Sequence, residues 1–298
     1  MNTAISAVLT SMRLPFLILT PACVFLGVSA VIANNITIDI YMLGLALLGA
    51  TLAHISVNTL NEYSDFKTGL DFKTQRTPFS GGSGALPQHP KMATAVLCVG
   101  LTALLGTVLI GLFFLWKFGL GIIPIGAIGV ALVIAYTPWV TKNPYLCLIG
   151  PGLGFGLLIV AGTGFVLTGE HALLPWFVGS VPFLLINNLL LLNQYPDIEA
   201  DRSIGRNNVL IAHGVKCGNR IYGLFVLLTI AVIVGLILAG ILPTLSFLAL
   251  LPMPLALFAL NGAMKYGNTI GGHPKFLAAN VVVAVLTPIL LGVSIIFG

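Results

Sequence analysis

The chain contains 298 residues, of which 58% are hydrophobic and only 7% are charged, and its mean hydropathy is +1.07. A soluble domain carries roughly 25% charged residues, so this composition excludes an ordinary soluble protein and indicates a chain embedded in the lipid bilayer. The net charge of +5 arises without a compact basic run or interleaved aromatic residues, so no nucleic-acid partner is expected. Four cysteines without a CxxC spacing indicate neither a metal site nor a disulfide framework.

Long apolar runs follow one another along the whole chain. About 20 apolar residues suffice for a helix to cross a bilayer. Nine such runs occur, at 14–34, 40–60, 92–114, 118–139, 145–168, 172–195, 218–240, 243–264 and 276–297. Pro138 and Pro144 separate the fourth run from the fifth. The first run has no cleavage site after it and is interpreted as a retained helix. The sequence therefore predicts an all-α fold, a polytopic membrane bundle of about nine transmembrane helices, in a single membrane-embedded domain over residues 1–298.

The basic residues predict the orientation of these helices, because the cytoplasmic loops of membrane proteins are enriched in lysine and arginine. With the N-terminus in the cytoplasm, twelve of the thirteen basic residues fall on the cytoplasmic side, and only Lys117 falls on the other side. We therefore expect an integral protein of the cell membrane with a cytoplasmic N-terminus and a C-terminus on the opposite side.

The acidic residues are concentrated in two short segments. Six of the eight lie in 61–71 and 193–201, and each segment ends an apolar run and precedes basic residues. Carboxylates are costly in a membrane environment and indicate a functional site by default. The predicted topology places both segments on the cytoplasmic side.

Within each segment, the spacing predicts which polar side chains share a helix face, because residues four apart lie on nearly the same face. The shared faces consist of Asn61 with Asp65, and of Asn193 with Asp197 and Asp201. Glu199 points away from the second face. Asp71 lies beyond Gly69, where the helix is expected to end, so periodicity does not give its direction. Pro196 would be accommodated by a kink.

An asparagine and several carboxylates on two facing helices offer hard oxygen ligands that suit Mg²⁺ shared with substrate phosphates. Basic residues close to the two segments can neutralise the anion: Lys67, Lys73, Arg76, Arg202 and Arg206. Acids, metal and bases together meet the needs of a leaving diphosphate, whose negative charge grows as the C–O bond breaks. In the simpler interpretation, the acids cap helices and pair with the loop bases, but the repeated Asn-x-x-x-Asp spacing favours a metal site.

Two further features carry weaker signals. His54 precedes Asn58 by one helical turn, and it either faces a cavity or packs as a hydrogen-bonded histidine in the core. Residues 81–84 read Gly-Gly-Ser-Gly and form either a flexible lid or a turn that faces phosphate.

The two acidic segments resemble the two Asp-rich motifs of the UbiA superfamily of intramembrane prenyltransferases, and the similarity in length and helix number covers nearly the whole chain. Residues 136–142 are also similar to the Tyr-Pro…Lys loop that follows the fourth helix in this superfamily. The resemblance implies a helical bundle around a central cavity. In it, a polyprenyl diphosphate would be bound through Mg²⁺ and ionised, and its allylic cation would pass to an acceptor.

The resemblance also implies roles for individual residues. The metal ligands would be Asn61, Asp65, Asp71, Asn193, Asp197 and Asp201, and the four aspartates among them are the catalytic candidates. The substrate-binding candidates would be Asn61, Lys67, Lys73, Arg76, Tyr136, Lys142, Asn193, Arg202 and Arg206.

Residues 61–71 are most similar to the menaquinone branch of the superfamily, which attaches a polyprenyl tail to dihydroxynaphthoate. Glu62 replaces the aspartate that is common in that branch. Residues 205–209 read Gly-Arg-Asn-Asn-Val where relatives usually have Gly-Lys-Arg-Thr, so one basic residue is missing. The implied function is an integral-membrane prenyltransferase that uses a polyprenyl diphosphate and an aromatic acceptor.

Two other functions stay open at this point. A terpene cyclase of the same superfamily would keep the metal site but quench the cation within the prenyl chain. An ion-coupled transporter would place its acids near the bilayer midplane, often in broken helices, whereas these acids end helices beside basic loops. A CDP-alcohol phosphotransferase is not indicated, because its Asp-Gly-x-x-Ala-Arg signature is absent from the sequence.

Overall fold

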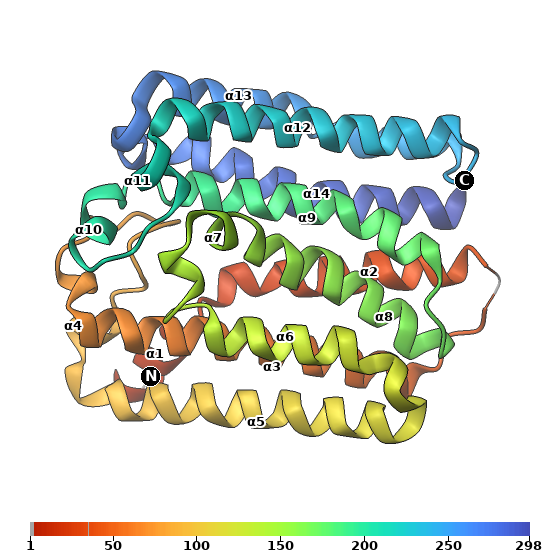
Figure 1. Cartoon of the computed structure of the whole chain (residues 1–298), viewed down its shortest axis with the longest axis horizontal. Coiled ribbons are helices and arrows are strands. Elements are labelled where there is room, and N and C mark those ends of the chain that lie inside the picture. Colours follow the sequence, from red (N-terminus) through yellow and green to blue (C-terminus); the bar gives the residue numbers. More distant parts are fainter. Residues whose placement is uncertain (1–2, 35) are drawn as a thin grey trace.

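The computed structural model describes residues 3–34 and 36–298, which form helices joined by short loops and contain no strand. The long helices lie side by side along the longest axis of the molecule (Figure 1). An apolar chain favours this arrangement, because each helix satisfies its own backbone hydrogen bonds and presents apolar side chains to lipid or to its neighbours. The all-α fold predicted from the sequence is confirmed.

The helices follow one another without large insertions. The first part of the chain contains α1 (Thr3–Ser11), η1 (Leu14–Ile18), α2 (Leu19–Ile32), α3 (Ile40–Thr68), η2 (Leu70–Phe72), α4 (Ala85–Gln88), η3 (Pro90–Met92), α5 (Ala93–Phe118), η4 (Gly119–Ile122) and α6 (Ile123–Ala135). The middle part contains η5 (Val140–Lys142), α7 (Pro144–Pro151), the π-helix η6 (Gly152–Leu158), α8 (Ile159–Thr168), α9 (Leu173–Asn193) and α10 (Ile198–Ser203). The last part contains α11 (Val209–His213), α12 (Val215–Leu238), η7 (Thr244–Leu250), α13 (Met253–Tyr266), η8 (Gly267–Gly272) and α14 (Pro274–Phe297).

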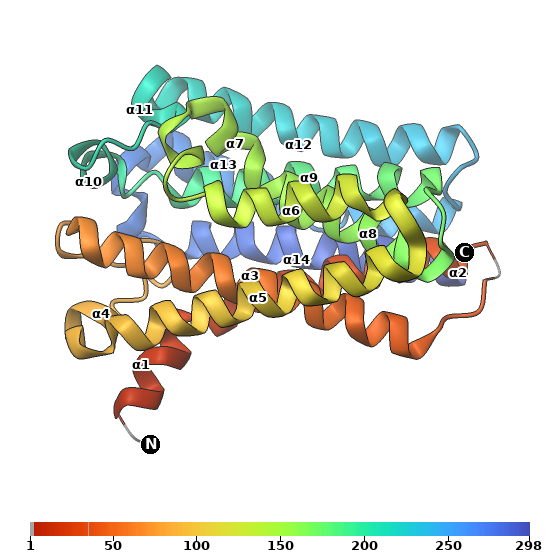
Figure 2. The ribbon, with the colours of Figure 1, turned by 60° about the horizontal axis from the view of Figure 1, so that its bottom comes forward.

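Eight helical stretches within the described residues are long and apolar enough to cross a membrane. The longest, Pro90–Ala135, contains 46 residues and turns back at Gly119, whose φ of +69° glycine adopts without steric cost. Helices α5 and α6 are therefore antiparallel neighbours (Figure 2). With this turn counted, the described part of the chain makes nine passages along the bundle, as the apolar runs predicted.

The two ends of the bundle differ in character. The acidic segments, the loop between α3 and α5, and helices α10 and α11 lie at the same end as the N-terminus (Figures 1 and 2). The C-terminus lies at the other end. An odd number of passages requires this separation of the termini, and it brings both acidic segments to one end of the bundle.

The larger apolar core is built around α9, α12 and α14. Within it, the Tyr222 hydroxyl donates to Asn280 Oδ1 at 2.7 Å, and the Asn280 amide donates to the Asn188 carbonyl at 3.1 Å. The Asn188 amide in turn donates to the Tyr222 carbonyl at 3.0 Å. Such hydrogen bonds between membrane helices help to fix their relative positions. Helix α9, which ends at the second acidic segment, is thereby held in this core.

Candidate active site

A polar pocket of about 110 Å³ lies between the two acidic segments. Its walls come from the end of α3, from η2 and the loop that follows, from the end of α9, and from α10. The pocket is lined by all of the predicted metal ligands, which are Asn61, Asp65, Asp71, Asn193, Asp197 and Asp201. The fold therefore brings these side chains together, although the two segments are far apart in the chain.

The first acidic segment is positioned by the C-terminal end of α3. The helix continues to Thr68, and Gly69 ends it in the left-handed conformation with a φ of +79°. The chain then turns through η2, so that Asp71 is buried and lines the same pocket as Asp65. The turn at Gly69 thus directs Asp71 toward the pocket, which helical periodicity alone does not predict.

The second acidic segment does not continue its helix. Helix α9 ends at Asn193, a turn follows, and the short helix α10 begins after Asp197. Pro196 lacks a backbone N–H, which favours a break at this point where a kink was expected. The predicted continuous helical stripe from Asn193 to Asp201 is therefore wrong. The turn nevertheless directs the three polar side chains of this segment into the pocket.

Arg206 joins the two acidic segments across the pocket. Its guanidinium donates from Nη1 to Asp201 Oδ1 at 3.0 Å and from Nη2 to Asp65 Oδ1. With its amide oxygen turned toward the arginine, Asn61 accepts from Nη2 at 3.2 Å and donates to Asp65 at 3.3 Å. The planar guanidinium carries donors in fixed directions, so one arginine can bind a carboxylate from each segment.

The glycine-rich loop at 81–84 is hydrogen-bonded to both acidic segments. The Gly81 N–H donates to Asp197 Oδ2 at 3.0 Å, and the Ser83 N–H donates to Glu62 Oε1 at 3.0 Å. Because Glu62 belongs to the first segment and Asp197 to the second, the loop connects the two at the edge of the pocket.

Glycine is required within this loop. Gly81 and Gly82 have φ angles of +78° and +72°, which residues with a side chain rarely adopt. A Cβ on Gly82 would lie 2.6 Å from Asp71 Oδ1, closer than van der Waals contact allows. The loop can therefore approach the carboxylates of the pocket only because it has no side chain at this position.

Two charged residues that were not assigned to the site from the sequence form a pair beside the pocket, and one of them, Arg13, lines it. Glu62 is fully buried, and Arg13 Nη2 lies 3.4 Å from Glu62 Oε2. Arg13 lines the pocket from the turn before η1, where its φ of +54° is left-handed. This conformation costs about 1–2 kcal/mol in a residue with a side chain. No sequence pattern reveals the pair, because their contact joins positions 49 residues apart.

Apart from Arg206, all of the predicted substrate-binding cations are exposed and do not line the pocket: Lys67, Lys73, Arg76, Lys142 and Arg202. Arg76 donates to the Ser83 carbonyl at 3.1 Å, and Arg202 pairs with the exposed Glu199 at 3.3 Å. Tyr136, by contrast, lines the pocket together with Arg206. Cations that are close to the acids in the chain are therefore not the same as those that are close in space.

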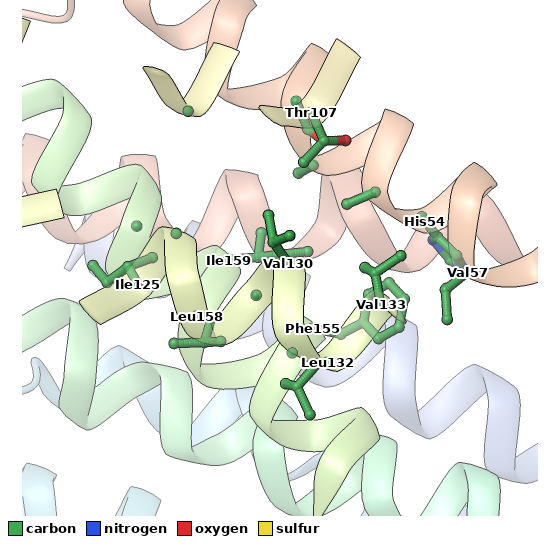
Figure 3. A pocket seen from close by; sticks show the side chains of 18 of the residues that line it. His54, Val57, Thr107, Ile125, Val130, Leu132, Val133, Phe155, Leu158 and Ile159 are labelled. Atoms are coloured by element: carbon green, nitrogen blue, oxygen red, sulfur yellow. The ribbon is translucent and has the colours of Figure 1, made fainter. Parts of the chain in front are cut away.

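An apolar cavity of about 570 Å³ adjoins the polar pocket and lies between α3, α5, α6, η6 and α8 (Figure 3). Aliphatic side chains form most of its wall, among them Val57, Val130, Leu132, Val133, Leu158 and Ile159. The residues shared by the pocket and the cavity define the junction between them: Arg13, Asn61, Phe79, Tyr136, Leu190 and Asn193. A polar group in the pocket can therefore carry an apolar chain that lies in the cavity.

The π-helix η6 forms one wall of this cavity. It begins after Pro151, and the Gly152 N–H donates outside the helix to Asn187 Oδ1 at 2.6 Å. Phe155, within η6, lines the cavity (Figure 3). Single π-helical turns inside longer helices occur frequently at functional sites, and this one adjoins the cavity.

The pocket contains oxygen atoms that have no partner. Among the described residues, Asp71 Oδ2, Asn193 Oδ1 and Asp197 Oδ1 are buried and accept no hydrogen bond. Burial, and then the charge of Glu62, raises the pKa of Asp71 to about 7. Burial, and then the charge of Asp201, raises the pKa of Asp197 to about 7. Both shifts mean that the site disfavours its own negative charge, so a bound cation would be stabilised there.

These oxygen atoms suit a hard divalent cation such as Mg²⁺. Within residues 3–34 and 36–298, no three acidic, histidine or cysteine side chains converge on one point. The ligands lie instead on two sides of the pocket, where phosphate oxygens and water would complete the coordination. The unpartnered oxygens therefore fit metal ions that are shared with a phosphorylated substrate.

The fold and the pocket define a polytopic membrane protein in which a carboxylate-lined pocket adjoins a large apolar cavity. The family model of the UbiA prenyltransferase family matches residues 19–270, and the chain belongs to this family. It is accordingly a membrane-embedded enzyme that transfers prenyl groups, and the family predicted from the two acidic segments is confirmed.

Similar sequences include two proteins named 1,4-dihydroxy-2-naphthoate octaprenyltransferase. The protein from Haemophilus influenzae is 32% identical over 225 residues, which cover 71% of this chain and 70% of the relative. The protein from Bacillus subtilis is 24% identical over 239 residues, which cover 77% and 73%. Both names fall in the menaquinone branch that residues 61–71 indicated.

Similar solved structures show that the fold is shared along nearly the whole chain. A UbiA homologue from Archaeoglobus fulgidus, bound to DMAPP and Mg²⁺, has a TM-score of 0.68 over 97% of this chain and 99% of that chain, at 16% identity. A digeranylgeranylglyceryl phosphate synthase has a TM-score of 0.65 over 99% of both chains, also at 16% identity.

Proposed function

We propose that this enzyme transfers a polyprenyl group from a polyprenyl diphosphate to an aromatic acceptor of the dihydroxynaphthoate type. The observation that carries the proposal is the junction, where the acid-lined pocket and the apolar cavity share lining residues. A diphosphate suits the pocket and a hydrocarbon chain suits the cavity. A substrate that occupies both has its reactive carbon, which connects the two parts, at the junction.

The side chains that would hold Mg²⁺ are Asn61, Asp65, Asp71, Asn193, Asp197 and Asp201. When bound, Mg²⁺ neutralises the negative charge that develops on a diphosphate as its C–O bond breaks. The Mg²⁺ in a similar protein of known structure supports this assignment. Arg13 and Arg206 add fixed positive charge within the pocket, where a low dielectric makes such charges more effective than in water.

The walls of the junction suit an allylic cation. Phe79 and Tyr136 line it, and aromatic faces stabilise a nearby cation. The apolar wall that includes Leu190 excludes water, which would otherwise react with the cation. Under these conditions the nucleophile is chosen by its position, so an electron-rich ring carbon held at the junction forms the new C–C bond.

Two observations support the class of acceptor. The spacing of residues 61–71 is similar to that of the menaquinone branch. The relatives from Haemophilus influenzae and Bacillus subtilis are both named for dihydroxynaphthoate as their acceptor. The lipid bilayer would take up the part of a long polyprenyl tail that the cavity does not hold.

The test is a product assay with purified protein, Mg²⁺, a radiolabelled polyprenyl diphosphate and a panel of aromatic acceptors. We expect a carbon-linked polyprenyl product with dihydroxynaphthoate and little turnover without an acceptor. A cyclic hydrocarbon formed in the absence of any acceptor would identify a terpene cyclase instead. An unreacted diphosphate with every acceptor would overturn the proposal.

We further propose that the N-terminus and both acidic segments face the cytoplasm and that the C-terminus faces the opposite side. The distribution of basic residues supports this orientation, and the two termini lie at opposite ends of the bundle (Figure 1). Reporter fusions at the loop that contains 81–84 and at the C-terminus test it. A C-terminal reporter that is active in the cytoplasm would contradict the orientation.

A further inference from the structure

His54 is a titratable residue in the wall of the apolar cavity. It lies on α3, seven residues before Asn61, which places it about 10 Å deeper along the helix axis than the junction. Only 3% of its surface is exposed, and its neighbours in the cavity wall include Val57 and Val133 (Figure 3). An ionisable side chain at such a depth is costly, so a function is expected for it.

The imidazole is held on two sides. Its Nδ1 atom lies 2.9 Å from the hydroxyl oxygen of Thr20, which is fully buried on α2. The ring of Phe155, on η6, packs edge-on against it with a distance of 4.3 Å between the ring centres. These two contacts come from different helices, and together they fix the plane of the imidazole. Its orientation is therefore set before any substrate enters.

The other nitrogen, Nε2, has no hydrogen-bond partner among the residues that the structure describes. It is also not among the polar atoms that the protein encloses completely. Since His54 lines the cavity, this nitrogen is left open to it. A polar atom in an apolar environment is expected to bind a polar group, because leaving it unpaired is unfavourable.

The chemistry of the substrates limits what that group can be. A polyprenyl tail is a hydrocarbon and offers no hydrogen-bond donor. The diphosphate is assigned to the polar pocket, on the far side of the junction from His54. The remaining substrate is the aromatic acceptor, whose ring hydroxyl groups can donate or accept a hydrogen bond and can lie in an apolar cavity. A hydroxyl of the acceptor is therefore the substrate group that matches Nε2.

We propose that His54 Nε2 forms a hydrogen bond with a ring hydroxyl of the aromatic acceptor and thereby determines which acceptor is bound and how it is placed. The inference rests on the proposed function, because it assumes an aromatic acceptor. The bond forms with either neutral tautomer, because a hydroxyl both donates and accepts: when Nδ1 accepts from the Thr20 hydroxyl, Nε2–H donates to the ring hydroxyl, and in the other tautomer Nε2 accepts from it. The bond holds the acceptor ring between His54 and the junction, where the prenyl carbon is presented.

The main test is the variant His54→Phe, which keeps an aromatic ring against Phe155 but removes both nitrogens. We expect kcat/KM for the acceptor to fall about tenfold, the cost of one hydrogen bond, while KM for the polyprenyl diphosphate changes less than about twofold. Thr107→Val is the matched control. It removes a hydroxyl from the same cavity wall, but that hydroxyl is already bonded to the Ala103 carbonyl at 3.0 Å. We expect no acceptor-specific loss in the control.

An acceptor analogue separates recognition from packing. Methylation of the ring hydroxyl removes its proton and places a methyl group beside its oxygen, so the wild type should lose about tenfold in kcat/KM while His54→Phe should lose little more. Equal losses in both proteins, or losses that affect both substrates of His54→Phe alike, would overturn the inference. If His54→Phe does not fold, Thr20→Val keeps the imidazole but removes its partner, and it should show a smaller loss of the same acceptor-specific kind.

A spectroscopic measurement on the wild type needs no substitution. With ¹⁵N-labelled histidine, addition of the acceptor alone should shift one Nε2 resonance, which the His54 variant identifies, and addition of the methylated analogue should not. An Nε2 resonance that does not respond would refute the role of His54. If the wild type prenylates no aromatic acceptor, the proposed function fails. If it does so and His54→Phe is unaffected, only the present inference fails.

Discussion

The two acidic segments share the spacing Asn-x-x-x-Asp, yet they reach the pocket on different backbones. In the first, α3 continues through Asn61 and Asp65, so the spacing acts through an unbroken helix. In the second, α9 ends at Asn193 and Asp197 lies in a turn. All four side chains line the same pocket. The common property of the segments is therefore the position of their oxygen atoms, and a helix is only one way to achieve it.

The difference in backbone changes what holds each aspartate. Asp65 is buried at 5% exposure and is bound by the guanidinium of Arg206. Asp197 accepts the Gly81 N–H on Oδ2 at 3.0 Å, while its Oδ1 is buried without a partner. The first carboxylate thus has a cation from the protein, whereas the second has only a backbone dipole. We infer that Asp197 depends more strongly on a metal cation than Asp65 does.

Removal of divalent metal should have the largest effect, because it acts on both segments at once. Without a cation, the carboxylates of the pocket would repel a diphosphate, so we expect no detectable product in excess chelator and recovery when Mg²⁺ is restored. Product formation is measured before and after dialysis. Turnover that survives exhaustive chelation would contradict the assignment of a metal to either segment.

Substitution of one aspartate in each segment should have the next largest effect. We expect Asp65→Ala and Asp197→Ala each to lower turnover at least about a hundredfold, while the protein still inserts into the membrane. The comparison predicts one difference between them. Asp197→Ala should raise the Mg²⁺ concentration needed for half-maximal activity more than Asp65→Ala does, and titration of both variants with Mg²⁺ measures this.

Glu199 provides the control for these variants. It belongs to the second segment, but its side chain is 74% exposed and pairs with Arg202 outside the pocket. Glu199→Ala should therefore change turnover less than about twofold. If Glu199→Ala lost as much activity as Asp197→Ala, the pocket described here would not be the site of the reaction.

The contact of Arg206 with both segments should depend on the shape of its side chain as well as on its charge. Lysine carries one compact charge and cannot bind Asp65 and Asp201 at once as the guanidinium of Arg206 does. We expect Arg206→Lys to lower kcat/KM for the diphosphate about tenfold. Arg202→Lys, which alters an exposed arginine, should leave it nearly unchanged. If Arg202→Lys lowered kcat/KM as much as Arg206→Lys did, the contact of Arg206 with both segments would not be the cause of the loss.

The bundle and the family could be predicted from the sequence because both follow from local properties, namely the length of apolar runs and the spacing within two short segments. The break at Pro196 could not, since a proline near a helix end is compatible with a kink or with a break. The contact between Arg13 and Glu62 also escaped prediction, because it exists only in the folded bundle. Lys73 and Arg76 are predicted to bind substrate because they are close to the first acidic segment in the chain, but both are exposed to solvent in the fold.

The smallest expected loss of activity is that caused by a substitution in the glycine-rich loop. A glycine beside each acidic segment can be replaced, so the two substitutions form a matched pair. Gly82 and Gly205 both have left-handed backbones, with φ angles of +72° and +81°. An alanine at either position incurs a similar conformational cost of about 1–2 kcal/mol. They differ in their surroundings, because a Cβ on Gly82 would lie 2.6 Å from Asp71 Oδ1, whereas a Cβ on Gly205 would meet nothing within 4 Å.

We therefore expect Gly82→Ala and Gly205→Ala to lower Tm by similar amounts, but only Gly82→Ala to lower kcat/KM for the diphosphate, by about fivefold. Thermal unfolding and steady-state kinetics in detergent measure the two effects separately. The methyl group added at Gly82 displaces the carboxylate of Asp71 in the first segment, whereas the methyl group added at Gly205 displaces no neighbouring atom. If both variants lost the same activity, the strained turn alone would explain it, and the first segment would not depend on close contact with the loop.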